Sequence, residues 1–238
     1  GIFFEAHKSI FIEGGGTFLG TNITVFSVDI IIDDGGSLHA DALGYRTEDT
    51  QTESVNIGLG VTSSQGSSGA GHGGTSGLGA GTSLTGQPYG HLYQPYAYGS
   101  AGGGGRGIGG NGGGMLWLNV SNVLEIDGEI RANGGNATGL SGGGGSGGSI
   151  WIYTHWFKGM GDITANGGSQ YAGGPGGGGA AGRIAIYFNV NQTYRGTYQA
   201  HGGYAEGNAE PGGPGTVFLY HQRENHTTLY INNFMRKS

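Results

Sequence analysis

The chain has 238 residues, of which 59 are glycine, 5 are proline and none is cysteine. The glycines follow no Gly-X-Y period, which excludes collagen, and they alternate with compact apolar runs, which argues against disorder. The formal net charge is −6, with 10 Lys and Arg against 16 Asp and Glu and no basic run. The sequence therefore predicts no basic surface that could bind the phosphates of a nucleic acid. We expect no membrane-spanning segment, because no apolar run approaches ~20 residues. Disulfides and thiolate metal sites are excluded.

Two kinds of segment recur in a fixed order. Segments of the first type alternate apolar residues; clear copies begin at Met115, Ser149, Arg183 and Thr216, which lie 34, 34 and 33 residues apart. Segments of the second type follow the first three copies by 12 or 13 residues and begin at Gly128, Gly161 and Gly196. Each unit is therefore predicted to be a strand, a turn, a second strand and a glycine-rich return.

The first and last units are irregular. A unit beginning at Ile23 has a long return, residues 43–113, which is an insertion rich in glycine and tyrosine, and a half-unit over residues 10–19 precedes it. The last unit is predicted to end in a second-type strand near Tyr230, with no glycine return. The start at Gly1 suggests a mature or excised piece of a longer protein. An exposed sheet end is a template for another chain, so the irregular ends predict end-to-end association of like modules.

The period of two within the strands predicts which side chains face the core. The residues expected to point inward are Ile150, Ile152, Ile184 and Ile186 in the first type and Ile130, Ala132, Ile163 and Ala165 in the second, with Trp151 and Tyr187 outward. Stacking of these units predicts an all-β fold, a right-handed parallel β-helix or solenoid of ~34-residue units forming one domain over residues 1–238. Returns such as 142–148 and 173–182 are expected to pack as polyglycine-II-like threads, ordered and hydrogen-bonded to one another.

Five Asn-X-Ser/Thr sequons point to an extracellular or cell-surface N-glycoprotein. They are Asn22, Asn119, Asn136, Asn191 and Asn225, against about two expected by chance. Asn191 and Asn225 are expected in the turn after a first-type strand, and Asn119 on an outward position, so all three should face solvent. N-linked glycans are therefore predicted.

Several pieces occur in an order that resembles a known class of sequence: Gly71-His-Gly-Gly, the aromatic segment 88–100, Gly128-Glu-Ile-Arg-Ala-Asn-Gly-Gly, and the glycine runs beginning at Gly142 and Gly176. Over roughly residues 23–220 the chain resembles the glycine-rich extracellular region of large cell-surface glycine-rich proteins of plants and protists. The resemblance implies an extracellular location, but no activity and no functional residues. Members of that class carry cysteines, whereas this chain has none.

Acidic residues near the first unit could carry chemistry. Asp33 and Asp34, with Asp29 and Asp41 nearby, could bind Ca²⁺ or act as acid and base, as in β-helical polysaccharide enzymes. The alternative is a solvated turn leading into Gly35. No later unit repeats the acidic cluster, so no catalytic residue and no other metal site are assigned. The glycine runs lack the lysine of a phosphate-binding loop.

Aromatic and histidine side chains supply the remaining candidates. Tyr89, Tyr93, Tyr96 and Tyr98 lie in the insertion and could bind glycans or a protein partner, or could instead seal the side of the solenoid. His72 and His91 are expected to pack or form hydrogen bonds rather than bind a metal. His201 occupies the position of Asn133 and Asn166 in the repeat, which predicts a ladder of side chains.

These observations favour a structural module of an extracellular filament, surface hair, wall or coat, which associates with like subunits and carries glycans. The alternative is an adhesion or glycan-binding module of a large receptor-like protein or viral tail fibre. A polysaccharide-active β-helix enzyme is a more distant alternative, and we expect the protein not to be an enzyme.

Overall fold

The computed structural model describes residues 1–47, 58–191 and 194–233. Within these residues lie twelve β-strands and no α-helix. The strands are β1 (Ile2–Ile12), β2 (Thr17–Leu19), β3 (Asn22–Ile32), β4 (Ser37–His39), β5 (Met115–Ile126), β6 (Glu129–Arg131), β7 (Ser149–Lys158), β8 (Asp162–Thr164), β9 (Arg183–Asn191), β10 (Thr197–Gln199), β11 (Thr216–His221) and β12 (His226–Tyr230). A search of this described part finds no helix with the length and apolar character needed to cross a membrane.

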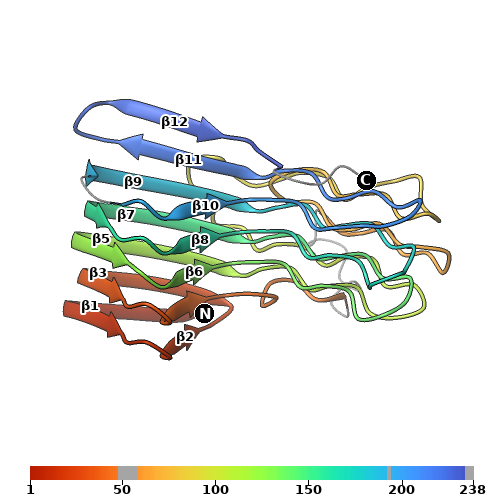
Figure 1. The fold of residues 1–238 in the computed structure, drawn as a ribbon, viewed down its shortest axis with the longest axis horizontal. Coiled ribbons are helices and arrows are strands. Elements are labelled where there is room, and N and C mark those ends of the chain that lie inside the picture. Colours follow the sequence, from red (N-terminus) through yellow and green to blue (C-terminus); the bar gives the residue numbers. More distant parts are fainter. Residues whose placement is uncertain (48–57, 192–193, 234–238) are drawn as a thin grey trace.

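The strands form two separate sheets (Figure 1). Sheet A has seven strands in the order β1-β3-β5-β7-β9-β11-β12, and its neighbours are parallel except for β11 and β12. Sheet B has five parallel strands in the order β2-β4-β6-β8-β10. The chain alternates between a long strand of sheet A and a short strand of sheet B. The predicted all-β architecture with parallel strands is confirmed, and neither sheet closes on itself.

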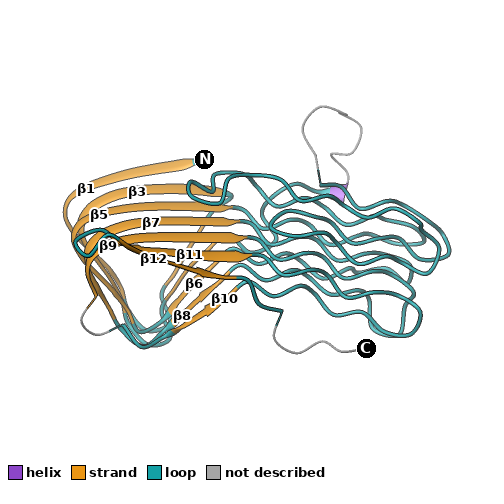
Figure 2. Cartoon of the chain, turned by 90° about the horizontal axis from the view of Figure 1, so that it is seen from above, coloured by secondary structure: helices purple, strands orange, loops and turns teal. Residues whose placement is uncertain are grey.

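The long strands of sheet A bend midway along their length (Figure 2). Register shifts mark the bend in three neighbouring strand pairs; between β3 and β5 the shift lies between Ser27 and Ile30. Such irregularities are β-bulges, which kink a strand. The hydroxyl of Ser27 lies 2.8 Å from the carbonyl oxygen of Lys8 and 2.7 Å from that of Asp29. A side-chain donor thus reaches carbonyl groups at the bulge.

The sequence predicted a turn where this bend lies, and that prediction was wrong. β5 continues to Ile126 and β7 to Lys158, with inward-facing apolar residues on both sides of the bend. In β3 the buried Ser27 is followed by buried Ile30 three residues later, so the period of two changes phase. A phase change together with polar residues looks like a turn in the sequence, although the strand continues through it.

The apolar core lies between the two sheets. All eight residues predicted to point inward have an exposed fraction of 0 %: Ile150, Ile152, Ile184, Ile186, Ile130, Ala132, Ile163 and Ala165. Trp151 and Tyr187 are half-buried and lie outside the core cluster. The predicted faces are therefore confirmed. Full burial of an isoleucine side chain stabilises a fold by about 1.5–3 kcal/mol relative to exposure, so these rows are a main source of stability.

The glycine-rich returns are extended segments that form hydrogen bonds with one another. One series of N–H to O=C bonds, each 2.7–3.0 Å, runs from Gly212 to Gly203, Gly179, Gly168, Gly145 and Gly135. A Cβ atom placed on Gly144 would lie 1.9 Å from the carbonyl oxygen of Gly168. Only glycine permits such an approach between backbones. The predicted hydrogen bonding between returns is confirmed. We call the returns and the described part of the insertion the glycine layer.

The described part of the insertion, residues 43–47 and 58–113, joins this layer and also reaches sheet A. Ala70 N–H donates to Gly144 O at 2.9 Å, and Gly177 N–H donates to Ser67 O at 2.8 Å. At the other end, the hydroxyl of Tyr187 donates to Tyr93 O at 2.7 Å. Residues 48–57 of the predicted insertion lie outside the described residues.

Both ends of the coil differ from the prediction. The N-terminal half-unit expected over residues 10–19 is a complete pair of strands, β1 and β2, because the apolar residues from Ile2 onward also pair with β3. The C-terminal strand expected in the second type is instead β12, which pairs antiparallel with β11 in sheet A. β11 ends at His221, opposite Phe188 of β9, so it lacks the second part of the long strand that leads to sheet B in the earlier units. Asn225 adopts a φ of +49° in the turn that follows, a conformation that asparagine tolerates.

Candidate functional site

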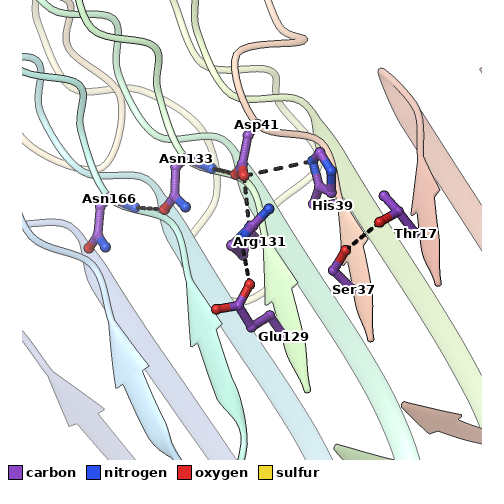
Figure 3. Close-up of polar contacts among 8 residues, drawn as sticks. All are labelled: Thr17, Ser37, His39, Asp41, Glu129, Arg131, Asn133 and Asn166. Carbon is purple, nitrogen blue, oxygen red and sulfur yellow. Dashed lines mark hydrogen bonds and ion pairs between the residues drawn. The ribbon is translucent and has the colours of Figure 1, made fainter. Parts of the chain in front are cut away.

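A ladder of polar side chains follows the ends of the short strands of sheet B (Figure 3). The carboxylate of Asp41 accepts a hydrogen bond from Asn133 N at 2.7 Å; the Oδ1 of Asn133 accepts from Asn166 N at 2.7 Å; and the Oδ1 of Asn166 accepts from His201 N at 2.9 Å. The predicted ladder is confirmed, and Asp41 is its first rung. Each side chain completes the backbone pairing of the next coil, so the ladder serves the fold rather than a ligand.

The charged residues around the first rung are paired with one another. Arg131 Nε lies 2.8 Å from Asp41 Oδ2, and the guanidinium also contacts the carboxylate of Glu129. His39 Nδ1 lies 3.7 Å from Asp41 Oδ2. These side chains are 18–45 % exposed, so the pairs contribute little to stability. The sequence analysis missed this pairing; the strand register places His39 opposite Arg131, and Asp41 follows two residues later.

The acidic residues near the first unit occupy different structural positions. Asp33 and Asp34 lie in the turn between β3 and β4, where Gly36 N–H donates to Asp33 O at 2.8 Å and Gly35 has a φ of +77°. Asp29 lies at the bend instead, where its carboxylate accepts from the Ser9 hydroxyl at 2.7 Å and from Asn122 Nδ2 at 2.8 Å. Among the described residues no group of three or more His, Cys, Asp or Glu is placed to hold a metal ion. The calcium site at Asp33 and Asp34 remains a prediction.

Hydrogen bonding from Ser9 holds the pKa of Asp29 below its ordinary value. The backbone N–H of Val123 and the amide of Asn122 act in the same direction, while desolvation opposes them. Asp29 therefore stabilises the bend as a carboxylate.

The four tyrosines of the insertion divide into two pairs. Tyr89 is half-buried: its hydroxyl donates to Tyr98 O at 2.5 Å and lies 2.8 Å from Ser100 Oγ. Tyr98 is half-buried and packs edge-on against Tyr45 at 5.6 Å. Tyr93 and Tyr96 are each 57 % exposed. Only the second pair offers ring surface to a ligand, and sequence reasoning could not separate the two.

Aromatic rings also line the outer face of sheet A. Successive ring centroids lie 4.5–5.7 Å apart in the row Phe3, Phe26, Trp117, Trp151, Tyr153, Tyr187 and Phe218. Trp117 and Trp151 are nearly parallel, with an angle of 12° between their planes, and the rings of Tyr153 and Tyr187 are stacked. Stacked rings cover each other's faces, so the middle of the row offers little surface for a sugar. Phe3 ends the row and is 65 % exposed.

His72 and Arg183 join the insertion to the rest of the molecule. The Nδ1 of His72 lies 2.6 Å from Gly147 O and its ring packs on Tyr89 at 4.6 Å. Arg183, at the start of β9, donates through Nε to Tyr89 O at 2.9 Å. Complete burial lowers the pKa of His72 to about 4, and nearby Arg183 adds to this effect, so the imidazole is neutral at pH 7. The expectation that His72 packs and forms a hydrogen bond is confirmed.

His91 and His201 also have the packing roles that the sequence suggested. His91 is exposed and stacks on Tyr96 at 5.5 Å. His201 Nδ1 lies 3.1 Å from Asn232 O, in addition to its backbone bond in the ladder. Neither arrangement resembles a metal site.

The sequons lie at different depths. Asn136 and Asn225 are exposed, Asn225 in the turn before β12, while Asn22 and Asn119 are half-buried. Asn136 Oδ1 accepts from Ser169 N at 2.7 Å, which forms a second ladder that the sequence did not reveal. Asn191 ends β9 rather than lying in a turn, and the rest of its sequon lies outside the described residues.

No protein-family model, curated protein or solved structure matches this chain.

Proposed function

We propose that this chain is a structural module of an extracellular filament, surface hair, wall or coat, and that like modules meet at the ends of their coils. In this proposal the alternating strands form a right-handed parallel β-helix, and the glycine returns form a polyglycine-II-like layer beside it. The resemblance to glycine-rich cell-surface proteins of plants and protists supports the same setting.

The glycine layer is the observation that carries the proposal. The extended segments of this layer are held together by backbone hydrogen bonds between residues far apart in the sequence, such as Gly73 N–H to Ala181 O at 2.8 Å. At Gly203 and Gly212 an added Cβ would lie 1.8 and 1.9 Å from a carbonyl oxygen. The glycine-rich returns of this layer carry few side chains for recognition or catalysis, and the exposed tyrosines lie in the insertion. The layer gives stiffness and width, which are the properties of a scaffold.

The exposed sequons support the extracellular part of the proposal. Glycans on Asn136 and Asn225 would leave the surface without displacing any buried side chain. Asn22 and Asn119 on sheet A could carry sugars if their half-buried side chains turn outward. Sugars at these positions would give solubility and protection from proteases.

Two measurements on native material test the proposal. Antibodies against the chain should label an ordered extracellular structure, and peptide mass spectrometry before and after enzymatic deglycosylation should find glycans on Asn136 and Asn225. Label confined to the cell interior, or a freely soluble protein with unmodified asparagine at every sequon, would overturn it.

Glycan binding by the insertion is the second candidate. The exposure of Tyr93 and Tyr96 favours it, because sugars stack on free aromatic surface. The variant with Tyr93→Ala and Tyr96→Ala should lose saturable binding to immobilised polysaccharide. Equal binding by this variant and the parent chain would exclude the insertion as the binding surface.

A further inference from the structure

The N-terminal edge of sheet A is a long strand with two apolar ends around a polar centre that includes Glu5 and Lys8. β1 has 11 residues and is the first strand of the sheet, so one side of its backbone has no partner strand among the described residues. Phe3 and Phe11 are 65 % and 64 % exposed, Phe4 is 46 % exposed and Ile2 is 39 % exposed. Proteins normally protect such edges with charge, proline or a short strand, and an unprotected edge pairs with another chain.

The opposite edge of sheet A has that protection. β12 has five residues, three of which are His226, Thr227 and Thr228, and it reverses direction relative to the parallel strands before it. It offers few hydrogen-bonding groups, and its first three residues are polar, although Leu229 and Tyr230 are 46 % and 50 % exposed. The two edges of sheet A are therefore unlike, and the longer one is at the N-terminal end.

The residue pattern of β1 is symmetric about its centre. Three apolar residues, 2–4, and three more, 10–12, flank the segment 5–9, which holds the strand's polar side chains. The inward face carries Ile2, Phe4, Ile10 and Ile12, as shown by pairing with inward residues of β3, and the outward face carries Phe3, Glu5, Ser9 and Phe11. Within β1 the alternation is unbroken through the bend, and the phase change lies in β3, between Ser27 and Ile30.

We propose that β1 binds β1 of a second copy of this chain, antiparallel and about a two-fold axis at the backbone of His7. In this register Phe3 lies opposite Phe11 of the second copy, Ile2 opposite Ile12, and Phe4 opposite Ile10. Every opposed apolar pair then lies on the same face of the joint sheet, as antiparallel pairing requires. An isologous contact of this kind must be self-complementary, and the symmetric pattern provides that property.

The core beside β1 fits the same symmetry. A hollow of about 460 Å³ opens at this end and is lined by Phe4, Ile10, Phe11, Ile12 and Phe18 together with polar residues of the turn. In Figure 2 the two arms of sheet A meet at the bend, and the strands of sheet B run back across the opening. A two-fold axis through the bend places the first part of β1, before the bend, beside the second part of β1 in the other copy. The same axis brings β2 against β2 of the second copy, with Phe18 at the centre of each. The second copy thus covers both the edge and the open core.

This inference rests on the proposed function only where it names the end at which modules meet. The predicted pairing itself follows from the residues of β1 alone. The chain has no cysteine, so engineered cysteines report contacts without background. One chain carrying Phe3→Cys is mixed with another carrying Phe11→Cys under mild oxidation, and each is also oxidised alone. The mixture should form disulfide-linked dimers at least tenfold faster than either variant alone, because position 3 faces position 11 across the axis.

Analytical ultracentrifugation of the whole chain gives the second readout. The parent chain should form concentration-dependent dimers, and Phe3→Lys should weaken dimerisation at least tenfold. Adding Phe11→Glu to Phe3→Lys should recover part of the loss, because opposite charges then face each other. Leu229→Lys, a matched change at an exposed position of β12, should leave the dimer unchanged.

Several results would overturn the inference. A monomer at all concentrations would do so, and so would Phe3→Cys chains that link most rapidly to themselves, which indicates parallel pairing. A dimer broken by Leu229→Lys but not by Phe3→Lys would move the contact to β12 and leave the structural function standing. If the natural protein is longer than this sequence, its β1 amides could be protected from exchange while the protein stays a monomer. That result would mean that β1 pairs with another strand of the same chain.

Discussion

The strand half and the glycine layer of this molecule reach order by opposite means. Between the sheets, rows of Ile, Leu and Val side chains exclude water, and the backbone follows from their alternation. In the glycine layer the segments that pack most closely are mostly glycine, and the backbones themselves pack and bond. The difference teaches that one half is sensitive to the polarity of a substitution, whereas the other is sensitive to the presence of any side chain at all.

The largest effect is expected in the strand half. Ile184→Asp places a carboxylate at a fully buried position with no partner, which should cost about 5 kcal/mol or more, enough to unfold a domain of ordinary stability. Urea unfolding followed by circular dichroism measures the loss. Leu229→Asp on the exposed surface of β12 is the control and should change stability by less than about 1 kcal/mol. Equal effects of the two changes would contradict the assigned core.

In the glycine layer an apolar side chain should be nearly as harmful as a charge is in the core. Gly144→Val forces a Cβ to within 1.9 Å of Gly168 O, so neighbouring glycine-rich returns must separate and lose hydrogen bonds. We expect a loss of about 3 kcal/mol or more and faster amide exchange along 142–148. Gly173→Asn is the control, because a Cβ at Gly173 meets nothing within 4 Å and asparagine tolerates its φ of +70°. Rapid exchange along 142–148 in the parent chain would show that the layer is not ordered.

Burial of His72 in the glycine layer should make the stability of the protein depend on pH. The pKa of this histidine is 6.5 when unfolded and about 4 when folded, because burial opposes the charged form. Between these values the unfolded state binds the proton and the folded state does not, so stability falls as pH drops from 6.5 to 4 and no further below. The loss should reach up to about 3 kcal/mol. Urea unfolding across this range should show a shallower pH dependence for His72→Gln than for the parent chain; identical dependences would contradict the buried neutral imidazole.

The smallest effect is expected at the junction of the two halves. Asn133→Ala removes the acceptor for Asn166 N, leaves a partly buried donor unpaired and should cost about 1 kcal/mol. Asn208→Ala, at an exposed turn of the last return, should cost less. Thermal unfolding of both variants measures the difference, and no difference would show that water replaces the ladder.

The sequence predicted the regular middle of the molecule well, because side-chain alternation and a fixed spacing act there together. Ile150 and Ile184 could be assigned to the core, and His201 to the ladder, from the repeat alone. The bend could not be predicted, because a β-bulge is visible only when Ser27 and Ile30 are compared with the strand beside them. Nor could the hairpin at Asn225, where a turn residue outweighs the periodic pattern.

The candidate surfaces were less predictable than the fold. The four tyrosines of the insertion look alike in sequence, and only their packing distinguishes half-buried Tyr89 from exposed Tyr96. The dependence of the insertion on Arg183 has no local signature, because donor and acceptor lie 94 residues apart. The symmetry of β1 was present in the sequence, but its meaning required the face of each residue and the knowledge that the strand is an edge.

The contacts within the glycine layer also shape how such a gene can change. An added glycine at the tip of a return disturbs no side chain in the core. A single lengthened return, however, extends beyond its neighbours and leaves its new N–H and C=O groups without protein partners. Selection should therefore favour adjacent returns of matching length, so that the width of the module changes across all coils together. The spacings of 34, 34 and 33 residues between the starts of the last four long strands show returns of matching length, whereas the insertion 43–113 departs from this spacing.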